Sequence, residues 1–297
     1  MHRTWRLRLR ALIPAVLVMS GLVVLLYPSI AGWFSQSDQS RLINQSVQEI
    51  SSGDLSPSVS QQLAAAHAYN DALSSGALLE AHHRLPTGAG VSTDPSESLN
   101  YNKLLVEPSG VMARLRIPSI NLDLPIYHGT STDTLSKGVG HLEGTSLPVG
   151  GKGTHAVLTG HRGLATATLF THLDKVRRGD TFTIGVLGQV LTYKVFDIAV
   201  VDPSDTASLK ADPTRDLVTL VTCTPLGINS QRILVTGERV TPTPARDRAD
   251  AARKSDLPGF PWWAVALGAG ALGAMAFVWR SGISPLLRPR HLRGRAP

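Results

Sequence analysis

The chain has 297 residues and a formal net charge of +7, but nine arginines and no acidic residues lie in residues 1–10 and 280–297, which leaves −2 for residues 11–279. The basic charge therefore belongs to the two tails, and the nearly neutral middle argues against nucleic-acid binding. Cys223 is the only cysteine, which excludes an intramolecular disulfide.

Two apolar stretches frame the chain. Residues 11–34 carry no charge and exceed the roughly 20 residues that cross a bilayer. Their length favours an uncleaved anchor over a cleaved signal peptide. A second stretch, residues 259–279, has tryptophans near both ends and is followed by arginines. Because both outer flanks are basic, we expect two transmembrane helices with both termini cytoplasmic and the middle outside.

Three glycines of the second stretch, Gly268, Gly270 and Gly273, match the pattern G-x-G-x-x-G. No strand precedes them, so the pattern indicates close helix packing rather than a dinucleotide site. We expect no cofactor. A single cysteine and the lack of a paired-histidine spacing also argue against a zinc site.

Residues 37–108 form a predicted helical lead-in and loop. The clearest helix has Ser56 as its expected N-cap, Pro57 in its first turn and Gly76 beyond its end. Residues 75–98 are rich in small residues and prolines without periodicity, which indicates a long surface loop. Such a loop is either a linker or a lid.

Residues 109–240 consist of short β-rich runs separated by Gly, Pro, Asp and Asn. This pattern favours one closed or sandwich-like β domain over an alternating α/β fold. Residues 241–258, with prolines and several charges, are predicted to link this domain to the second apolar stretch. The expected strands cover 113–117, 122–127, 155–158, 182–186, 190–201, 217–223 and 232–240.

Cys223 closes one strand-like run, and Arg232 opens the next. If the two runs are antiparallel neighbours, these residues lie together at one end of the sheet. The thiol is then a candidate nucleophile, although a lone cysteine is commonly an inert core residue. The guanidinium suits an oxyanion or a peptide carbonyl, or an ordinary surface ion pair.

His161 is the histidine best placed to serve such a thiol. It follows the run 156–158 and lies between Gly160 and Gly163, which permit close approach. A thiol and an imidazole together indicate cysteine acyl transfer, with the histidine moving a proton to the leaving amine. Three histidines of the same domain compete for this role: His128, His141 and His155.

Four segments closely resemble the class C, pilus-polymerising sortases of Gram-positive bacteria. They are Ile126-Tyr127-His128-Gly129-Thr130, residues 138–151, Leu158-Thr159-Gly160-His161-Arg162-Gly163, and Thr219-Leu220-Val221-Thr222-Cys223-Thr224-Pro225. The resemblance runs from about residue 68 to residue 240. It implies a mainly β fold, a sortase-like closed eight-stranded β-barrel with a helical lead-in and two flanking transmembrane helices.

The resemblance also implies a reaction. Cys223 would attack the Thr-Gly carbonyl of a Leu-Pro-x-Thr-Gly sorting signal to form a thioacyl enzyme. His161 would protonate the departing glycine amine, and Arg232 would position the signal and stabilise the oxyanion. A pilin lysine would then resolve the intermediate, so the implied partners are pilin subunits and the membrane bilayer.

Class C sortases resemble one another in a lid whose Asp-Pro-aromatic tip covers the active site. Here the corresponding tip is Asp94-Pro95-Ser96, in which serine replaces the aromatic ring. Asp94 and Pro95 also suit an ordinary turn. A second departure is Leu226, which stands where many relatives have tyrosine.

Two other functions fit parts of the sequence. A wall-anchored surface protein or pilin also ends in an apolar span and a basic tail, but Asp256-Leu257-Pro258-Gly259 lacks the threonine of a sorting signal. A housekeeping sortase that joins proteins to peptidoglycan would share the catalytic motif. The second span and the lid-like loop favour the pilus polymerase.

Overall fold

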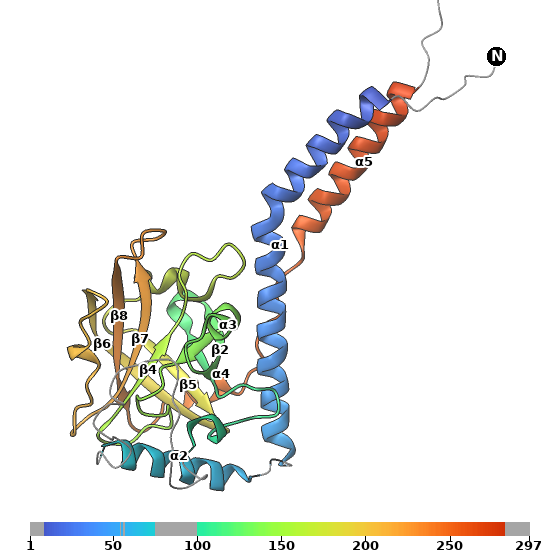
Figure 1. The fold of residues 1–297 in the computed structure, drawn as a ribbon. Helices are drawn as coiled ribbons and strands as arrows, with labels where there is room; N and C mark the ends of the chain where they lie inside the picture. Colours follow the sequence, from blue (N-terminus) through green and yellow to red (C-terminus); the bar gives the residue numbers. More distant parts are fainter. Residues whose placement is uncertain (1–8, 54, 56, 75–99, 283–297) are drawn as a thin grey trace, which may run out of the picture. The chain divides into compact units, whose positions relative to one another are not determined.

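The computed structural model describes residues 9–53, 55, 57–74 and 100–282 (Figure 1). Their contacts divide the chain into two compact units, one holding residues 9–30 and 259–282 and the other residues 31–258. Helix α1 (Leu9–Ser52) contributes to both units, and α5 (Trp262–Gly282) belongs to the first. Both helices are long and apolar enough to cross a bilayer, which is consistent with membrane anchoring.

Within the first unit, α1 and α5 pack closely at Gly270. A Cβ added there would lie 2.5 Å from Leu22 Cδ2 and 3.5 Å from Met19 Sδ, whereas a Cβ at Gly268 or Gly273 would meet no atom within 4 Å. The packing expected from the glycine pattern is therefore confirmed at one of its three positions.

The second unit is built on a closed eight-stranded barrel with the strand order β1-β2-β3-β4-β7-β8-β6-β5. The β2–β3 and β4–β7 pairs are parallel, and the other pairs are antiparallel. The strands are β1 (Ala113–Ile117), β2 (Leu122–His128), β3 (Val139–His141), β4 (Thr154–Thr159), β5 (Thr181–Val186), β6 (Gln189–Val201), β7 (Asp216–Thr224) and β8 (Gln231–Val240). The expected eight-stranded barrel is thus confirmed.

Strand β3 was not predicted from the sequence, because three residues with a central glycine show no alternation of apolar and polar side chains. Its glycine has a steric reason: a Cβ on Gly140 would overlap the Gly129 carbonyl oxygen. The short strand exists because β2 and β4 pair with it on either side. Tertiary pairing, not local propensity, forms this strand.

Helix α2 (Val59–Ser74) lies across the end of the barrel opposite the β7–β8 turn in Figure 1. Its Leu63, Ala66 and Tyr69 join the barrel core. The N-cap is Ser58, not Ser56: Gln61 N bonds to Ser58 Oγ, and Ser58 N donates to Gln61 Oε1. This reciprocal capping box places the first turn two residues later than the proline alone suggested.

Residues 241–258 contain α4 (Ala245–Ala251), which packs on the barrel. Arg114 Nη1 donates to the carbonyls of Ala251 and Arg253 at 3.1 and 2.8 Å, and Arg116 donates to Asp250 O. Arginines at a helix C-terminus compensate its unpaired carbonyls and its negative dipole end. The segment is therefore held on the barrel by β1.

The remaining helices are short. They are α3 (Thr132–Lys137) and the 3-10 helices η2 (Tyr101–Lys103), η3 (Pro118–Ile120), η4 (Leu169–Lys175) and η5 (Ala207–Leu209). Of these, η4 contributes the buried Leu169, Phe170 and Leu173 to the core. Its position against the end of β4 shapes the candidate site.

Candidate active site

The ends of β7 and β8 bring together two of the residues singled out in the sequence. The antiparallel ladder pairs Cys223 directly with Arg232, as predicted. Directly opposed residues of an antiparallel pair project from the same face. Cys223 is a free, partly exposed thiol. A free thiol and a cation therefore share one face at the loop end of the barrel.

His161 reaches the same end of the barrel from β4. Strands β4 and β7 are parallel, with Thr159 paired to Val221, and Gly160 N donates to Val221 O at 3.1 Å. Thr222 Oγ1 also donates to Gly160 O at 2.7 Å, so the loop that begins with Gly160-His161 lies against the strand end that carries Cys223. The structure thus gathers at one strand end the three residues that the sequence proposed as catalytic.

Tight packing fixes the loop that carries His161. A Cβ added to Gly160 would lie 2.7 Å from Phe170 Cδ2, and Phe170 is fully buried. Phe170 N donates to His161 O at 3.0 Å. Gly163 has a φ of +76°, and an added Cβ there would lie 2.5 Å from Leu226 Cδ1. Because these two positions have no Cβ, Phe170 of η4 and Leu226 of the β7–β8 loop pack directly against the loop that carries His161.

Arg232 is held by the loop that connects β7 and β8. Its Nη1 donates to the carbonyl oxygens of Asn229 and Gln231, both at 3.0 Å. Asn229 has a φ of +60°, and its N–H donates to Pro225 O at 2.9 Å. A tight turn thus orients the guanidinium. Its remaining N–H groups extend the donor capacity of the site.

The three competing histidines lie in hydrogen-bonded interior positions. His155 Nδ1 donates to Lys210 O, His128 Nε2 donates to Leu104 O, and His141 is fully buried. Burial lowers the pKa of all three, that of His141 to about 4. A buried neutral imidazole with both nitrogens hydrogen-bonded, as in His141 and His155, suits structure better than proton transfer. His161, which is only partly buried, is the better candidate.

Sequence reasoning overlooked Arg162. Its guanidinium donates to Thr224 Oγ1 at 3.0 Å and pairs with Asp174 Oδ2 at 2.7 Å. The side chain is only 12% exposed. The available signal was an arginine next to the candidate histidine, together with threonines on both sides of Cys223. Neither the arginine nor the threonines indicate a contact until the strand pairing that brings Arg162 to Thr224 is known.

The lid residues Asp94, Pro95 and Ser96 lie outside the residues that the structure describes. Leu226 is described and is 56% exposed beside the His161 loop. An aliphatic side chain therefore covers part of that loop.

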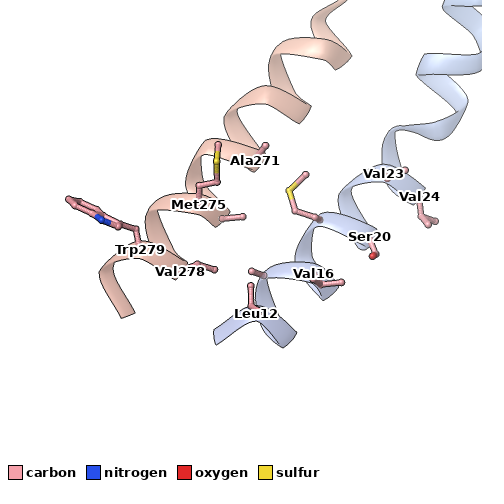
Figure 2. A pocket seen from close by; sticks show the side chains of 12 residues that line it. Leu12, Val16, Ser20, Val23, Val24, Ala271, Met275, Val278 and Trp279 are labelled. Atoms are coloured by element: carbon pink, nitrogen blue, oxygen red, sulfur yellow. The ribbon is translucent and has the colours of Figure 1, made fainter. Parts of the chain in front are cut away.

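An apolar pocket lies between α1 and α5, with a volume of about 750 Å³. Figure 2 shows some of the side chains that line it, among them Val16, Val24 and Met275. None of the predicted catalytic residues lines it. Among residues 9–53, 55, 57–74 and 100–282, no group of three His, Cys, Asp or Glu side chains is arranged to hold a metal ion. The strand end with Cys223 remains the candidate active site.

Comparisons with known proteins agree with this site. A family model described as "Sortase domain" matches residues 115–240. Sortase D of Bacillus subtilis is 30% identical over 156 residues, which cover 52% of this chain and 76% of that protein. The chain belongs to the sortase family. It is a cysteine transpeptidase, and the matched region contains the β4, β7 and β8 ends described above.

Solved structures place this sortase near class C. Sortase C-1 of Actinomyces oris shares 50% identity with a TM-score of 0.53, covering 62% of this chain and 99% of that one. Sortase C of Streptococcus pneumoniae, whose structure is described as informative on pilin substrate specificity, shares 38% identity with a TM-score of 0.58 and covers 69% and 98%. The sortase fold and the likeness to class C sortases, expected from the sequence, are confirmed.

Proposed function

We propose that this sortase cleaves a Leu-Pro-x-Thr-Gly sorting signal between Thr and Gly and joins the threonine to a pilin lysine, so that pili are polymerised. The observation that carries the proposal is the convergence of Cys223, His161 and Arg232 at the ends of three barrel strands. The similarity to a sortase C described in terms of pilin substrates supports the choice of substrate.

The geometry suits a two-step acyl transfer. The Cys223 thiolate attacks the threonine carbonyl, and the carbonyl oxygen gains a negative charge in the tetrahedral intermediate. Arg232, on the same face one strand away, is placed to stabilise that oxyanion. As the C–N bond breaks, His161 donates a proton to the glycine amine, and a thioester to Cys223 remains.

The second step reverses the roles. A lysine ε-amine attacks the thioester carbonyl and gives its proton to His161. The C–S bond then breaks, which regenerates the Cys223 thiolate and leaves an isopeptide bond. The same imidazole thus serves as acid and then as base, so it has to lie within hydrogen-bond reach of both amines.

The proposal includes the placement of the chain. Residues 1–36 and 259–279 would anchor the enzyme, with residues 37–108 as lead-in and lid loop, residues 109–240 as the catalytic barrel outside the membrane, residues 241–258 as the connection, and residues 280–297 in the cytoplasm. The two apolar helices support this arrangement. Asp94, Pro95 and Ser96 would form the lid tip; if it gates Cys223, deleting residues 91–98 should speed thiol labelling.

Intact-mass analysis of the full chain in lipid nanodiscs tests the proposal. With a Leu-Pro-x-Thr-Gly peptide, the enzyme should gain the mass of the acyl fragment ending in threonine, and hydroxylamine should remove it. Cys223→Ala should gain no mass, whereas Arg178→Ala, which disrupts an exposed ion pair with Asp197, should behave like the native enzyme. Acylation of Cys223→Ala would contradict the assigned nucleophile.

Competing amines identify the acceptor. A purified pilin domain with accessible lysines should give covalent ladders that contain a Lys–Thr isopeptide bond. Release of the acyl group only by a peptidoglycan-precursor amine would instead indicate a housekeeping sortase. Absence of any acyl enzyme, with the chain itself cleaved or linked by another sortase, would indicate a wall-anchored surface protein.

A further inference from the structure

The residues on either side of Cys223 bond to the residues on either side of His161. Thr222 Oγ1 donates to Gly160 O at 2.7 Å, and Arg162 Nη1 donates to Thr224 Oγ1 at 3.0 Å. Successive residues of a strand point to opposite faces, so Thr222 and Thr224 share the face opposite to Cys223. The two hydrogen bonds therefore tie the loop to the strand behind the reacting side chains.

Arg162 extends this connection to a third element. Its Nη2 lies 2.7 Å from Asp174 Oδ2, and its Nε donates to Thr171 O at 3.4 Å, both in η4. The side chain is only 12% exposed, so these contacts are largely shielded from water. A planar guanidinium with five fixed donors can hold several groups at set angles, which a lysine ammonium cannot do.

We propose that Arg162 is a positioning residue that sets the separation between the His161 imidazole and the Cys223 sulfur by clamping the His161 loop to Thr224 and η4. The inference rests on the catalytic roles proposed above for Cys223 and His161. Arg162 itself touches neither reacting atom in this proposal; it acts through the backbone on both sides.

Proton transfer explains why this separation matters. General acid–base catalysis needs donor and acceptor within about 2.6–3.2 Å, and a misplacement of about 1 Å costs roughly 100-fold in rate. Gly160 is held by Thr222 on one side of the histidine. Without the matching contact at Arg162, only one flank of His161 would be fixed to the strand that carries the nucleophile.

The test compares four variants of the full chain in nanodiscs. Arg162→Ala removes all three contacts. Arg162→Lys keeps the positive charge but loses the planar guanidinium with its several donors. Thr224→Val removes only the acceptor on β7 and conserves the shape of the side chain. Arg178→Ala is the control, because it breaks an exposed ion pair of the same 2.7 Å length with Asp197, away from the site. The variants are compared by kcat and KM for a sorting peptide, by the pH profile of kcat, and by Tm.

We expect Arg162→Ala to lower kcat about 10- to 100-fold with KM within about threefold, and Arg162→Lys to recover little of the loss. Thr224→Val should lower kcat about tenfold. A fifth variant that combines Arg162→Ala with Thr224→Val should resemble Arg162→Ala alone, because both changes break the Arg162–Thr224 hydrogen bond. The pH dependence of Cys223 alkylation by iodoacetamide should change in Arg162→Ala and Thr224→Val and not in Arg178→Ala.

A merely structural role gives a different result. If Arg162→Ala lowers Tm while kcat and both pH profiles stay within twofold of the native enzyme, the positioning role is overturned. Should Arg162→Ala fail to fold, an unchanged kcat and alkylation profile in Thr224→Val overturns it equally. Retained activity of Cys223→Ala or His161→Ala would instead reject the proposed function, so the two failures are distinguishable.

Discussion

Two Gly-His pairs, one within a barrel strand and one directly after the neighbouring strand, have very different surroundings. Gly140-His141 lies in β3, and Gly160-His161 follows β4, which is antiparallel to β3. His141 is fully buried, whereas His161 is only partly buried beside the end of β7. The same dipeptide therefore serves the core in one place and the candidate active site in the other.

The surroundings of His141 explain its structural role. Its Nε2 donates to Ser146 O at 2.8 Å, and its Nδ1 accepts from the Tyr101 hydroxyl at 2.9 Å. The hydroxyl in turn accepts from Gly129 N at 2.9 Å, and the Tyr101 ring stacks on the imidazole. A neutral imidazole satisfies these bonds, and burial lowers its pKa to about 4. The comparison teaches that full burial and two committed nitrogens distinguish the structural His141 from the candidate catalytic His161.

The largest expected effect is the loss of activity when His161 is replaced. His161→Ala should lower kcat/KM by about 100- to 10,000-fold, because proton transfer to the leaving amine is lost. Its Tm should change little, since the side chain is partly exposed. Peptide-cleavage kinetics and thermal unfolding measure both quantities. A near-native rate would reject His161 as the acid.

His141→Leu should give the reverse pattern. Removing the imidazole leaves the buried Ser146 O without its donor and takes one acceptor from the Tyr101 hydroxyl, so we expect a loss of about 2–4 kcal/mol in unfolding free energy. The kcat of the folded fraction should stay near native. A large kcat loss without loss of stability would place His141 in the catalytic machinery.

The pH dependence of stability sharpens the role of His141. Its folded pKa of about 4 lies below the ordinary 6.5, so the unfolded chain takes up a proton first as the pH falls. Stability present above pH 6.5 should therefore decline by about 3 kcal/mol between pH 6.5 and 4. Denaturant unfolding of His141→Leu should show a shallower decline over this window. An identical slope would contradict the buried neutral imidazole.

The smallest expected effect concerns Glu107, a buried carboxyl whose pKa is raised, whereas that of His141 is lowered. Burial raises its pKa to about 7, and the nearby Glu49 carboxylate adds repulsion. The folded pKa of Glu107 exceeds the ordinary 4.5. The protonated carboxyl therefore contributes its full stability to the fold below pH 4.5, and this stability is lost as the pH rises through 7.

Glu107→Gln should therefore stabilise the chain by roughly 1–3 kcal/mol at pH 8, since the amide cannot ionise, and change little at pH 4. Unfolding in urea at the two pH values measures the difference. Asp197→Asn, at a carboxylate 45% exposed, is the matched control and should not stabilise the chain at pH 8. Equal stability of Glu107→Gln and the native chain at pH 8 would contradict the buried ionisable carboxyl.

Much of the barrel followed from local patterns. The runs that became β1, β5 and β8 alternate or concentrate apolar residues between clear breakers, and such patterns hold whenever one face is buried. The pairing of Cys223 with Arg232 was also predictable, because a short loop between two strands leaves an antiparallel ladder as the simple solution. The two apolar spans were evident from length and composition.

Other features were decided only by contacts between distant segments. Strand β3 depends on its neighbours, and α4 is held by arginines from β1. The sequence already favoured His161 over His141 from its place after a strand and between two glycines, and only the fold shows that His141 is fully buried.

The contact of Arg162 with Thr224 joins residues 62 positions apart. The sequence by itself determined which side chains had the chemistry for acyl transfer. The barrel decided which of them meet, because β4 and β7 are parallel neighbours far apart in the chain, and long-range pairing of this kind leaves no periodic trace in either segment.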